Sequence, residues 1–366
     1  MDFSLNEDQK MLSTSVADFA KNESTVERAR RLRDDAVGWE RPMWTQIAEL
    51  GWLMVPFPEE AGGLGWTFEE VALIVEQLGK TLVPEPYVPS ILAGYAVHLA
   101  GAAAQSESVL ERLFAGEISM ALAIGEKSNR HDPLSSDVQA TEGWTLTGTK
   151  TWVDNGHAAE LIVVSAATDA GPTLFLVEAA SAQIDPAGRL DGRKSATVTL
   201  SETPAEILGE PGSARDIIEK LFDLGAGLAV CEGVGVCQRM LDLTLEHLKV
   251  REQFGVPIGS FQALQHRAVD MFAEVELLRS IGMEVSERMT GDGAERRQAV
   301  SAAKVQLATG GKYVARQAIQ LHGGIGCTDE HDVGLFFKRL HTLDASFGDE
   351  TFHVARYADE PGFLDA

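Results

Sequence analysis

The residues best suited to bind a ligand lie in one stretch of the last third of the chain. Arg251 presents a planar guanidinium with paired N–H donors, which suits a pyrophosphate. Phe254 offers a ring for stacking, and Gln262 carries an amide that both donates and accepts hydrogen bonds. This combination predicts a site for a phosphate-bearing ligand.

A second group of candidate ligand contacts surrounds a glycine cluster and consists of Gln320, Leu321, Gly323, Gly324 and Gly326. A glycine has no Cβ, so the backbone of this segment can approach a ligand closely.

The other reactive side chains give no catalytic pattern. Cys231, Cys237 and Cys327 form no CxxC pair and have no nearby His cluster at metal-ligand spacing, so we expect neither disulfides nor zinc. Cys231 and Cys237 are interpreted as small buried residues. No Ser or Cys nucleophile pattern accompanies His266 or His322, so both are interpreted as packing or interface residues.

Composition narrows the classes of partner. The chain has 366 residues, of which 45% are hydrophobic and 23% charged, as in an ordinary soluble protein of two or three subdomains. Its 31 basic and 55 acidic residues give a formal charge of -24, which argues against nucleic acid as a partner. The N-terminal segment lacks a basic and an apolar region, and we expect no membrane span and a cytoplasmic location.

The elements that must position these residues fall into three consecutive segments. Helical spacing of Leu12, Val16 and Phe19, and a helix from about Phe68 to Leu78, predict an N-terminal α-domain over residues 1–116. Short β-rich runs predict a middle antiparallel β-domain over residues 117–209. These runs lie at residues 144–147, 161–164, 173–177 and 197–200.

Long helical patterns return after residue 209. Apolar residues recur every three or four positions from Val230 to Leu248, and three such helices to about Gln320 predict a C-terminal bundle over residues 210–366. The predicted fold class is therefore α+β.

Three motifs in the same order carry a resemblance to a known family. They are ELGW with PEEAGGLG and EQLGK over residues 49–80, REQFGVPIGSFQALQH over 251–266, and AIQLHGGIG over 318–326. Together they span most of the chain, and the sequence resembles the acyl-CoA dehydrogenases, which are FAD flavoproteins. The resemblance implies an N-terminal helical domain, a middle β-domain and a C-terminal helix bundle.

The resemblance also implies the cofactor contacts. Arg251, Phe254 and Gln262 of one protomer would contact FAD, and Gln320, Leu321, Gly323 and Gly324 would contact it from the neighbouring protomer. An oligomer is therefore expected.

A segment of the β-domain, GTKTWVDNG over residues 148–156, is similar to the family element whose aromatic residue lies against the flavin. Trp152 matches that aromatic. Asp154 stands where the family has a Thr or Ser that contacts the N5 edge of the ring, so a hydroxyl donor is replaced by a group that only accepts when it is ionised.

The catalytic base of the family is a glutamate that removes the α-proton of the acyl thioester. The matching run, ASFGD, places Phe347 at that position. The alternative position used by some members is Gly225, and the following Ala226 replaces an Arg that related enzymes use for CoA. The sequence therefore supplies no expected catalytic carboxylate.

This pattern matches the beta subunits of heterotetrameric acyl-CoA dehydrogenases that act on steroid side-chain or other bulky acyl-CoA thioesters. In these, an alpha-type subunit supplies the base. Glu232 and Glu350 remain alternatives as displaced bases, since Glu232 is expected two helical turns from Gly225 on the same face and Glu350 one turn beyond Phe347.

Three functional hypotheses stay open. The first is a subunit that oxidises an acyl-CoA to the trans-2-enoyl-CoA and passes electrons to an electron-transfer flavoprotein. The second is a non-catalytic subunit that completes the FAD site of a partner. The third is an acyl-CoA oxidase or flavin-dependent monooxygenase on the same fold.

Overall fold

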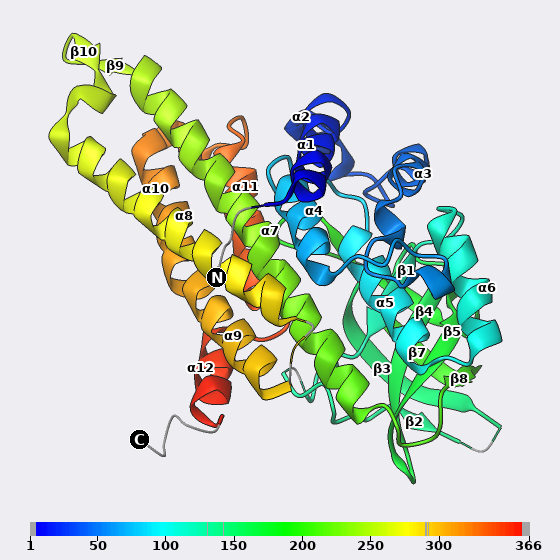
Figure 1. Cartoon of the computed structure of the whole chain (residues 1–366). Coiled ribbons are helices and arrows are strands. Elements are labelled where there is room, and N and C mark those ends of the chain that lie inside the picture. The colour runs from blue at the N-terminus through cyan, green and yellow to red at the C-terminus, as the bar shows by residue number, and fades with distance from the viewer. Residues whose placement is uncertain (1–4, 130, 142, 290, 292, 361–366) are drawn as a thin grey trace. The chain divides into compact units, whose positions relative to one another are not determined.

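The computed structural model describes residues 5–129, 131–141, 143–289, 291 and 293–360, and Figure 1 shows its elements. The chain forms two compact units. The helical unit comprises Met1–Arg30, Ala72–Val83 and Ala226–Ala366, and the sheet unit comprises Arg31–Val71 and Pro84–Gly225. The units interleave along the chain, and the three consecutive domains remain a prediction.

The sheet unit is built on one mixed sheet. Its path runs β6-β7-β3-β2-β4-β5-β8, and β1 pairs with β4. The strands are β1 Met120–Ala123, β2 Gln139–Ala140, β3 Thr145–Asp154, β4 Leu161–Thr168, β5 Gly171–Glu178, β6 Gln183–Gly188, β7 Lys194–Pro204 and β8 Glu206–Leu208. Its core includes Leu146, Ile162, Phe175 and Val198, all of which are buried.

The expectation of a wholly antiparallel sheet is corrected here. β1 and β2 both pair with β4 in parallel, whereas the other neighbouring strands are antiparallel. All four predicted β-rich runs lie in or at the edge of the strands β3, β4, β5 and β7. The strand β6 was not predicted because it is mostly exposed and contains Pro186 and Gly188, and so lacks an apolar alternation.

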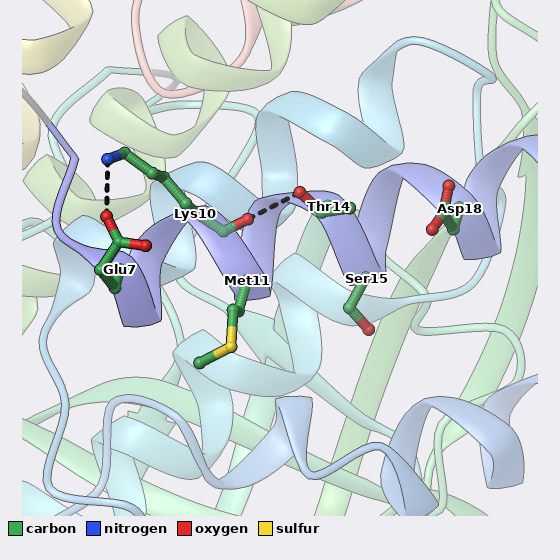
Figure 2. Close-up of a pocket in the computed structure, with 6 residues that line it drawn as sticks. All are labelled: Glu7, Lys10, Met11, Thr14, Ser15 and Asp18. Carbon is green, nitrogen blue, oxygen red and sulfur yellow. Dashed lines mark hydrogen bonds and ion pairs between the residues drawn. The ribbon is translucent and has the colours of Figure 1, made fainter.

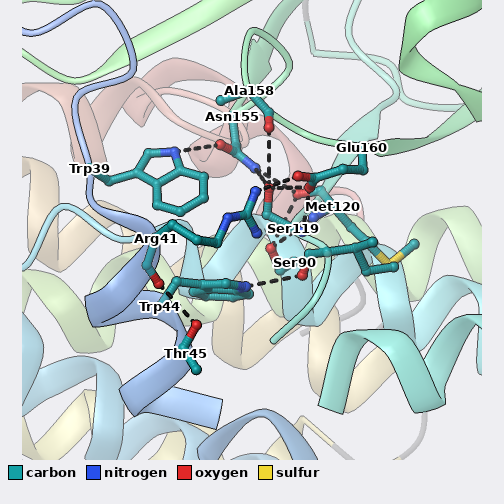
Figure 3. A network of polar contacts seen from close by, with 11 residues as sticks. Trp39, Arg41, Trp44, Thr45, Ser90, Ser119, Met120, Asn155, Ala158 and Glu160 are labelled. Carbon is teal, nitrogen blue, oxygen red and sulfur yellow. Dashed lines mark hydrogen bonds and ion pairs between the residues drawn. The ribbon is translucent and has the colours of Figure 1, made fainter. Parts of the chain in front are cut away.

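Helices α3 Arg41–Glu49, α5 Tyr87–Ala100 and α6 Ala103–Phe114 complete the sheet unit. A polar network connects α3 and α5 to residues at the edge of the sheet, as Figure 3 shows. The indole of Trp44 donates to the carbonyl of Ile118 over 3.0 Å, Arg41 pairs with Glu160, and Glu160 accepts from the amide of Ser119 over 2.7 Å. These contacts join residues far apart in the sequence and stabilise the sheet unit.

The helical unit contains the long helices. They are α1 Glu7–Asn22, α8 Gln262–Arg288, α9 Gly293–Gln306, α10 Lys312–His322, α11 Val333–Ala345 and α12 Glu350–Ala358. The helices α2 Val26–Leu32, α4 Phe68–Gly79 and α7 Arg215–Val250 have residues in both units. Asn6 and Gln9 form a capping box at the start of α1, and the predicted face of Leu12, Val16 and Phe19 is buried.

The third predicted helix of the bundle is present in two parts. A π-helical turn at Leu307–Gly311 connects α9 to α10.

Helices α4 and α7 approach each other very closely at Gly235. A Cβ at this position would lie 2.0 Å from the carbonyl oxygen of Glu76. Glycine is therefore required at Gly235.

Helix α7 changes one expectation. No membrane span was expected from the sequence, but by length and composition this helix is apolar enough to cross a membrane. However, 94% of its apolar window is buried inside the protein, as in the core helix of a globular fold.

Candidate functional site

The REQFG segment forms a short hairpin between α7 and α8. Strands β9 Glu252–Gln253 and β10 Val256–Pro257 pair antiparallel, and Phe254 and Gly255 both have positive φ at the turn. The side chain of Phe254 is 93% exposed, and its ring lies 6.1 Å from that of Phe261 in an edge contact. A ring this exposed is available to a ligand or another chain.

Arg251 and Gln262 lie at the two ends of this hairpin, and both are exposed. The amide of Arg251 donates to the carbonyl of His247 over 2.9 Å, and its carbonyl accepts from Ile258 over 2.8 Å. These backbone bonds fix the hairpin and leave the guanidinium free of any carboxylate partner within the described residues.

The glycine cluster lies where α10 ends. Gly323 has a φ of 66°, and a Cβ on either Gly323 or Gly324 would meet nothing within 4 Å. Gln320 is exposed, whereas the side chain of Leu321 is buried. Leu321 therefore reaches a ligand only through its backbone.

Three histidine rings connect the two motifs. The ring of His322 is buried, and its centroid lies 4.7 Å from that of His247 and 4.4 Å from that of His331. Burial, with smaller contributions from His331 and His247, lowers the pKa of His322 to about 4, although the hydrogen bond to the carbonyl of Ala318 opposes the shift. His322 is therefore neutral near pH 7, and it places the glycine cluster beside the base of the hairpin.

The Phe347 position lies in a turn between α11 and α12. Phe347 has a φ of 53°, and its carbonyl bonds the ring Nε2 of His353 over 2.8 Å. Buried Lys304 donates to the carbonyls of Leu343, Asp344 and Ser346 over 2.7 to 2.8 Å. The turn is thus firmly held although it carries a phenyl ring in place of a carboxylate.

The Nζ of Lys304 faces three carbonyl acceptors, which match the three N–H donors of an ammonium group. Burial lowers the pKa of Lys304 to about 7, while Asp344 and Asp349 oppose the shift. This role of Lys304 was not predicted from the sequence, because a lysine in a helix is normally exposed.

Glu232 is engaged in a buried ion pair. Arg339 donates from Nε to one carboxylate oxygen of Glu232 over 2.7 Å and from Nη2 to the other over 2.6 Å. Both side chains are 6% exposed. A carboxylate fixed in this bidentate pair is not placed to abstract a substrate proton.

Glu350 occupies a different position from the one expected. It is the first residue of α12, so it does not share a helix with Phe347. Its carboxylate lies 3.5 Å from Nζ of Lys312, which also lies 3.2 Å from Asp344.

In the sheet unit, Trp152 and Asp154 lie at the end of β3. A register shift occurs between Lys150 and Val153, and Trp152 has a φ of 55° and is 57% exposed. Val153 between them is buried, so Trp152 and Asp154 lie on the opposite, outward side of the strand. Asp154 is paired with Arg189, a partner that the sequence motifs did not indicate.

The alternative base position, Gly225, lies in the middle of α7. Every residue from 221 to 237 of this helix is buried, including Ala226. No carboxylate or arginine is present at these two positions.

Neither a depression on α1 nor a metal-binding cluster of the described residues adds to the candidate site. A depression on α1 is lined by Glu7, Lys10, Met11, Thr14, Ser15 and Asp18, as Figure 2 shows. It contains no motif residue, and its Glu7–Lys10 pair is an exposed contact of 2.9 Å. Among the residues that the structure describes, no group of three or more His, Cys, Asp or Glu side chains could hold a metal ion.

Comparison with known proteins agrees with this architecture. Residues 6–117 match the N-terminal domain of acyl-CoA dehydrogenases, and residues 215–359 match their C-terminal domain. The chain belongs to the acyl-CoA dehydrogenase family.

Individual relatives support the assignment. The chain is 32% identical to acyl-CoA dehydrogenase IpdE2 of Mycobacterium tuberculosis, over 92% of this chain and 91% of that protein. The ChsE4-ChsE5 complex from Mycobacterium tuberculosis is 27% identical with a TM-score of 0.90, over 99% of this chain and 100% of the matched chain. The Tcur3481-Tcur3483 steroid ACAD is also 27% identical, with a TM-score of 0.89 over 97% and 98% of the two chains.

FAD is the cofactor of this family, and several observed features fit it. The guanidinium of Arg251 has no carboxylate partner within the described residues, the ring of Phe254 is open, and the backbone at Gly323 and Gly324 is uncovered. These groups suit a pyrophosphate, a flat ring and close backbone approach respectively.

Proposed function

We propose that this chain is a FAD-holding subunit of an acyl-CoA dehydrogenase whose catalytic glutamate comes from a second, related chain. The reaction is the α,β-dehydrogenation of an acyl-CoA thioester to the 2-enoyl-CoA, with an electron-transfer flavoprotein as electron acceptor. The FAD, when bound, accepts the hydride that leaves the β-carbon.

The proposal rests on the positions where a catalytic glutamate is expected and on the glutamates that could replace it. By the resemblance, Phe347 and Gly225 stand at the two base positions of the family. Of the two displaced candidates, Glu232 is held by Arg339 in a buried bidentate pair, and Glu350 lies 3.5 Å from Lys312. Removing an α-proton requires a carboxylate within hydrogen-bond reach of the substrate.

The positions of the motifs refine how FAD would be held. The ring of His322, just before the glycine cluster, lies 4.7 Å from that of His247, whose carbonyl accepts from the amide of Arg251. As the resemblance implies, Arg251, Phe254 and Gln262 of one protomer would contact FAD together with the glycine cluster of the neighbouring protomer. Trp152 and Asp154 would contact the flavin ring on the outward side of β3.

A partner chain would have exposed apolar side chains to contact on α8 and the hairpin. Phe254, Val269, Phe272 and Leu277 are all more than half exposed. We propose that these side chains are covered by the partner chain. Similarity to the ChsE4-ChsE5 complex and to the steroid ACAD favours a heterotetramer with an alpha-type subunit and a steroid side-chain or similarly bulky acyl-CoA as substrate.

The test is reconstitution with the related acyl-CoA dehydrogenase subunit. The chain alone should give no turnover of acyl-CoA, and the complex should reduce its FAD when acyl-CoA is added without oxygen. Replacing Arg251 by Ala should weaken FAD binding by about ten- to a hundred-fold, because a charge-assisted bond contributes roughly 1.5 to 3 kcal/mol. A stable homotetramer of this chain that turns over acyl-CoA would refute the proposal.

The same assay separates the other hypotheses. A complex that keeps full activity when this chain loses its FAD contacts would indicate a purely structural subunit. Oxygen consumption with peroxide formation would indicate an oxidase.

A further inference from the structure

Asp154 is held by an arginine in a partly exposed ion pair, whereas the Glu232–Arg339 pair is buried. Within the described residues, the carboxylate of Asp154 accepts only from Arg189. The side chain of Asp154 is 44% exposed and that of Arg189 is 16% exposed. The arginine is therefore more enclosed than the group it holds.

Arg189 is fixed by a tight turn between β6 and β7. Its amide donates to the carbonyl of Arg193 over 2.9 Å, and its carbonyl accepts from Gly192 over 3.1 Å. Gly192 has a φ of 83°, and a Cβ there would lie 2.5 Å from Arg33. Nε of Arg189 also lies 3.8 Å from the buried carboxylate of Asp191. The guanidinium is thus held in place from its own turn and points to Asp154.

The pair lies beside the exposed ring of Trp152, on the same side of β3. We propose that Arg189 is a positioning residue for this edge: it orients and neutralises the Asp154 carboxylate, and the pair together sets how easily a flavin bound there is reduced. This inference rests on the proposed function, because Trp152 and Asp154 are assigned to the flavin by that proposal.

Asp154 and Arg189 would influence the reduction of the flavin through their charges. Two-electron reduction gives the flavin more negative charge, and groups near the N5 edge tune its electronics. An unpaired carboxylate there would oppose reduction through a partly desolvated interaction. The guanidinium offsets this charge.

The test measures the midpoint potential of bound FAD in the full-length chain, or in its complex with the partner subunit if that is the form that retains FAD. In Arg189→Ala, the carboxylate is left unpaired, and the ratio of affinities for reduced and oxidised FAD should fall at least tenfold. That change corresponds to about 30 mV for a two-electron couple. Asp154→Ala should shift the ratio in the opposite direction.

Two further variants separate a role in tuning from a role in folding. Asp154→Thr restores the hydroxyl of the family, and combining it with Arg189→Ala should bring the potential back towards wild type. Arg41→Gln removes a comparable ion pair of the sheet unit, with Glu160, and should leave the potential unchanged. If Arg189→Ala does not fold, Asp154→Thr alone still tests the shift.

The two possible failures are distinguishable. FAD bound with wild-type potential in both Arg189→Ala and Asp154→Ala, or in Asp154→Thr alone where Arg189→Ala does not fold, would overturn this inference and leave the proposed function intact. Absence of FAD from both the wild-type chain and its complex would overturn both.

Discussion

Glu232 and Asp154 are each held by an arginine, but their surroundings differ. Both members of the Glu232–Arg339 pair are 6% exposed, whereas Asp154 is 44% exposed next to the open ring of Trp152. A buried bidentate pair has all of its bonding capacity directed to protein groups, so it holds helices α7 and α11 together. The Asp154–Arg189 pair is partly exposed, so a ligand can approach it, whereas the Glu232–Arg339 pair is enclosed by the protein.

The largest expected effect comes from breaking the buried pair. Glu232→Gln leaves the Arg339 charge buried without its partner, and we expect a loss of about 3 to 5 kcal/mol in the free energy of unfolding. Denaturant unfolding checks this. A double variant, Glu232→Leu with Arg339→Met, should recover most of the loss, because apolar residues of similar volume replace a buried pair at little cost. A loss below about 1 kcal/mol in Glu232→Gln would contradict the comparison.

The next effect concerns the Phe347 turn. Lys304→Met removes the donor to three carbonyls and should lower the free energy of unfolding by about 2 to 4 kcal/mol. Lys312→Met is the matched control, since Lys312 makes only longer ion pairs, and its cost should be about 1 kcal/mol or less. Equal losses in the two variants would show that the turn does not depend on Lys304.

The lowered pKa of His322 predicts that the free energy of unfolding depends on pH. Its pKa in the folded protein is about 4, below its ordinary value of 6.5, because burial disfavours the charged ring. Between these values the unfolded chain binds a proton that the folded chain does not, so stability falls as pH falls from about 6.5 to 4. The loss should be on the order of 2 kcal/mol. Replacing His322 by Asn should flatten this slope in denaturant titrations at pH 7 and pH 5, and an unchanged slope would contradict the assignment.

The smallest effect is expected at Glu350. Its contact with Lys312 is 3.5 Å and part-exposed, so Glu350→Gln should change the free energy of unfolding by less than about 1 kcal/mol. Turnover of the reconstituted complex should also be nearly unchanged. Thermal unfolding and acyl-CoA turnover measured on one preparation check both statements.

The sequence predicted the fold class because its signals were local and strong. The spacing of Leu12, Val16 and Phe19 reflects burial of one face of a helix. The β-rich run at 161–164 reflects burial of both faces of a strand. The strand β6 and the parallel pairing of β1 with β4 escaped prediction, since an exposed edge strand has no apolar alternation and pairing direction is set by distant residues.

The candidate site shows the same division. Motifs identified Arg251, Phe254 and Trp152, and the structure shows all three side chains exposed. Motifs did not identify Arg189 or Arg339, because an ion pair depends on residues that are 35 and 107 positions apart in the chain. Arg189 matters because it pairs with Asp154, and Arg339 because it pairs with Glu232.

The central claim is that this chain contributes no catalytic base, and single-turnover reduction of FAD by acyl-CoA in the reconstituted complex tests it most directly. Replacing the base-position glutamate of the partner by Gln should slow this step by a hundred-fold or more, as expected for loss of a general base. In this chain, Glu350→Gln and the Glu232→Leu/Arg339→Met double variant, which removes the carboxylate without leaving a buried charge, should both reduce FAD at close to the wild-type rate. A hundred-fold loss in either one, with FAD content and assembly intact, would show that this subunit carries its own base.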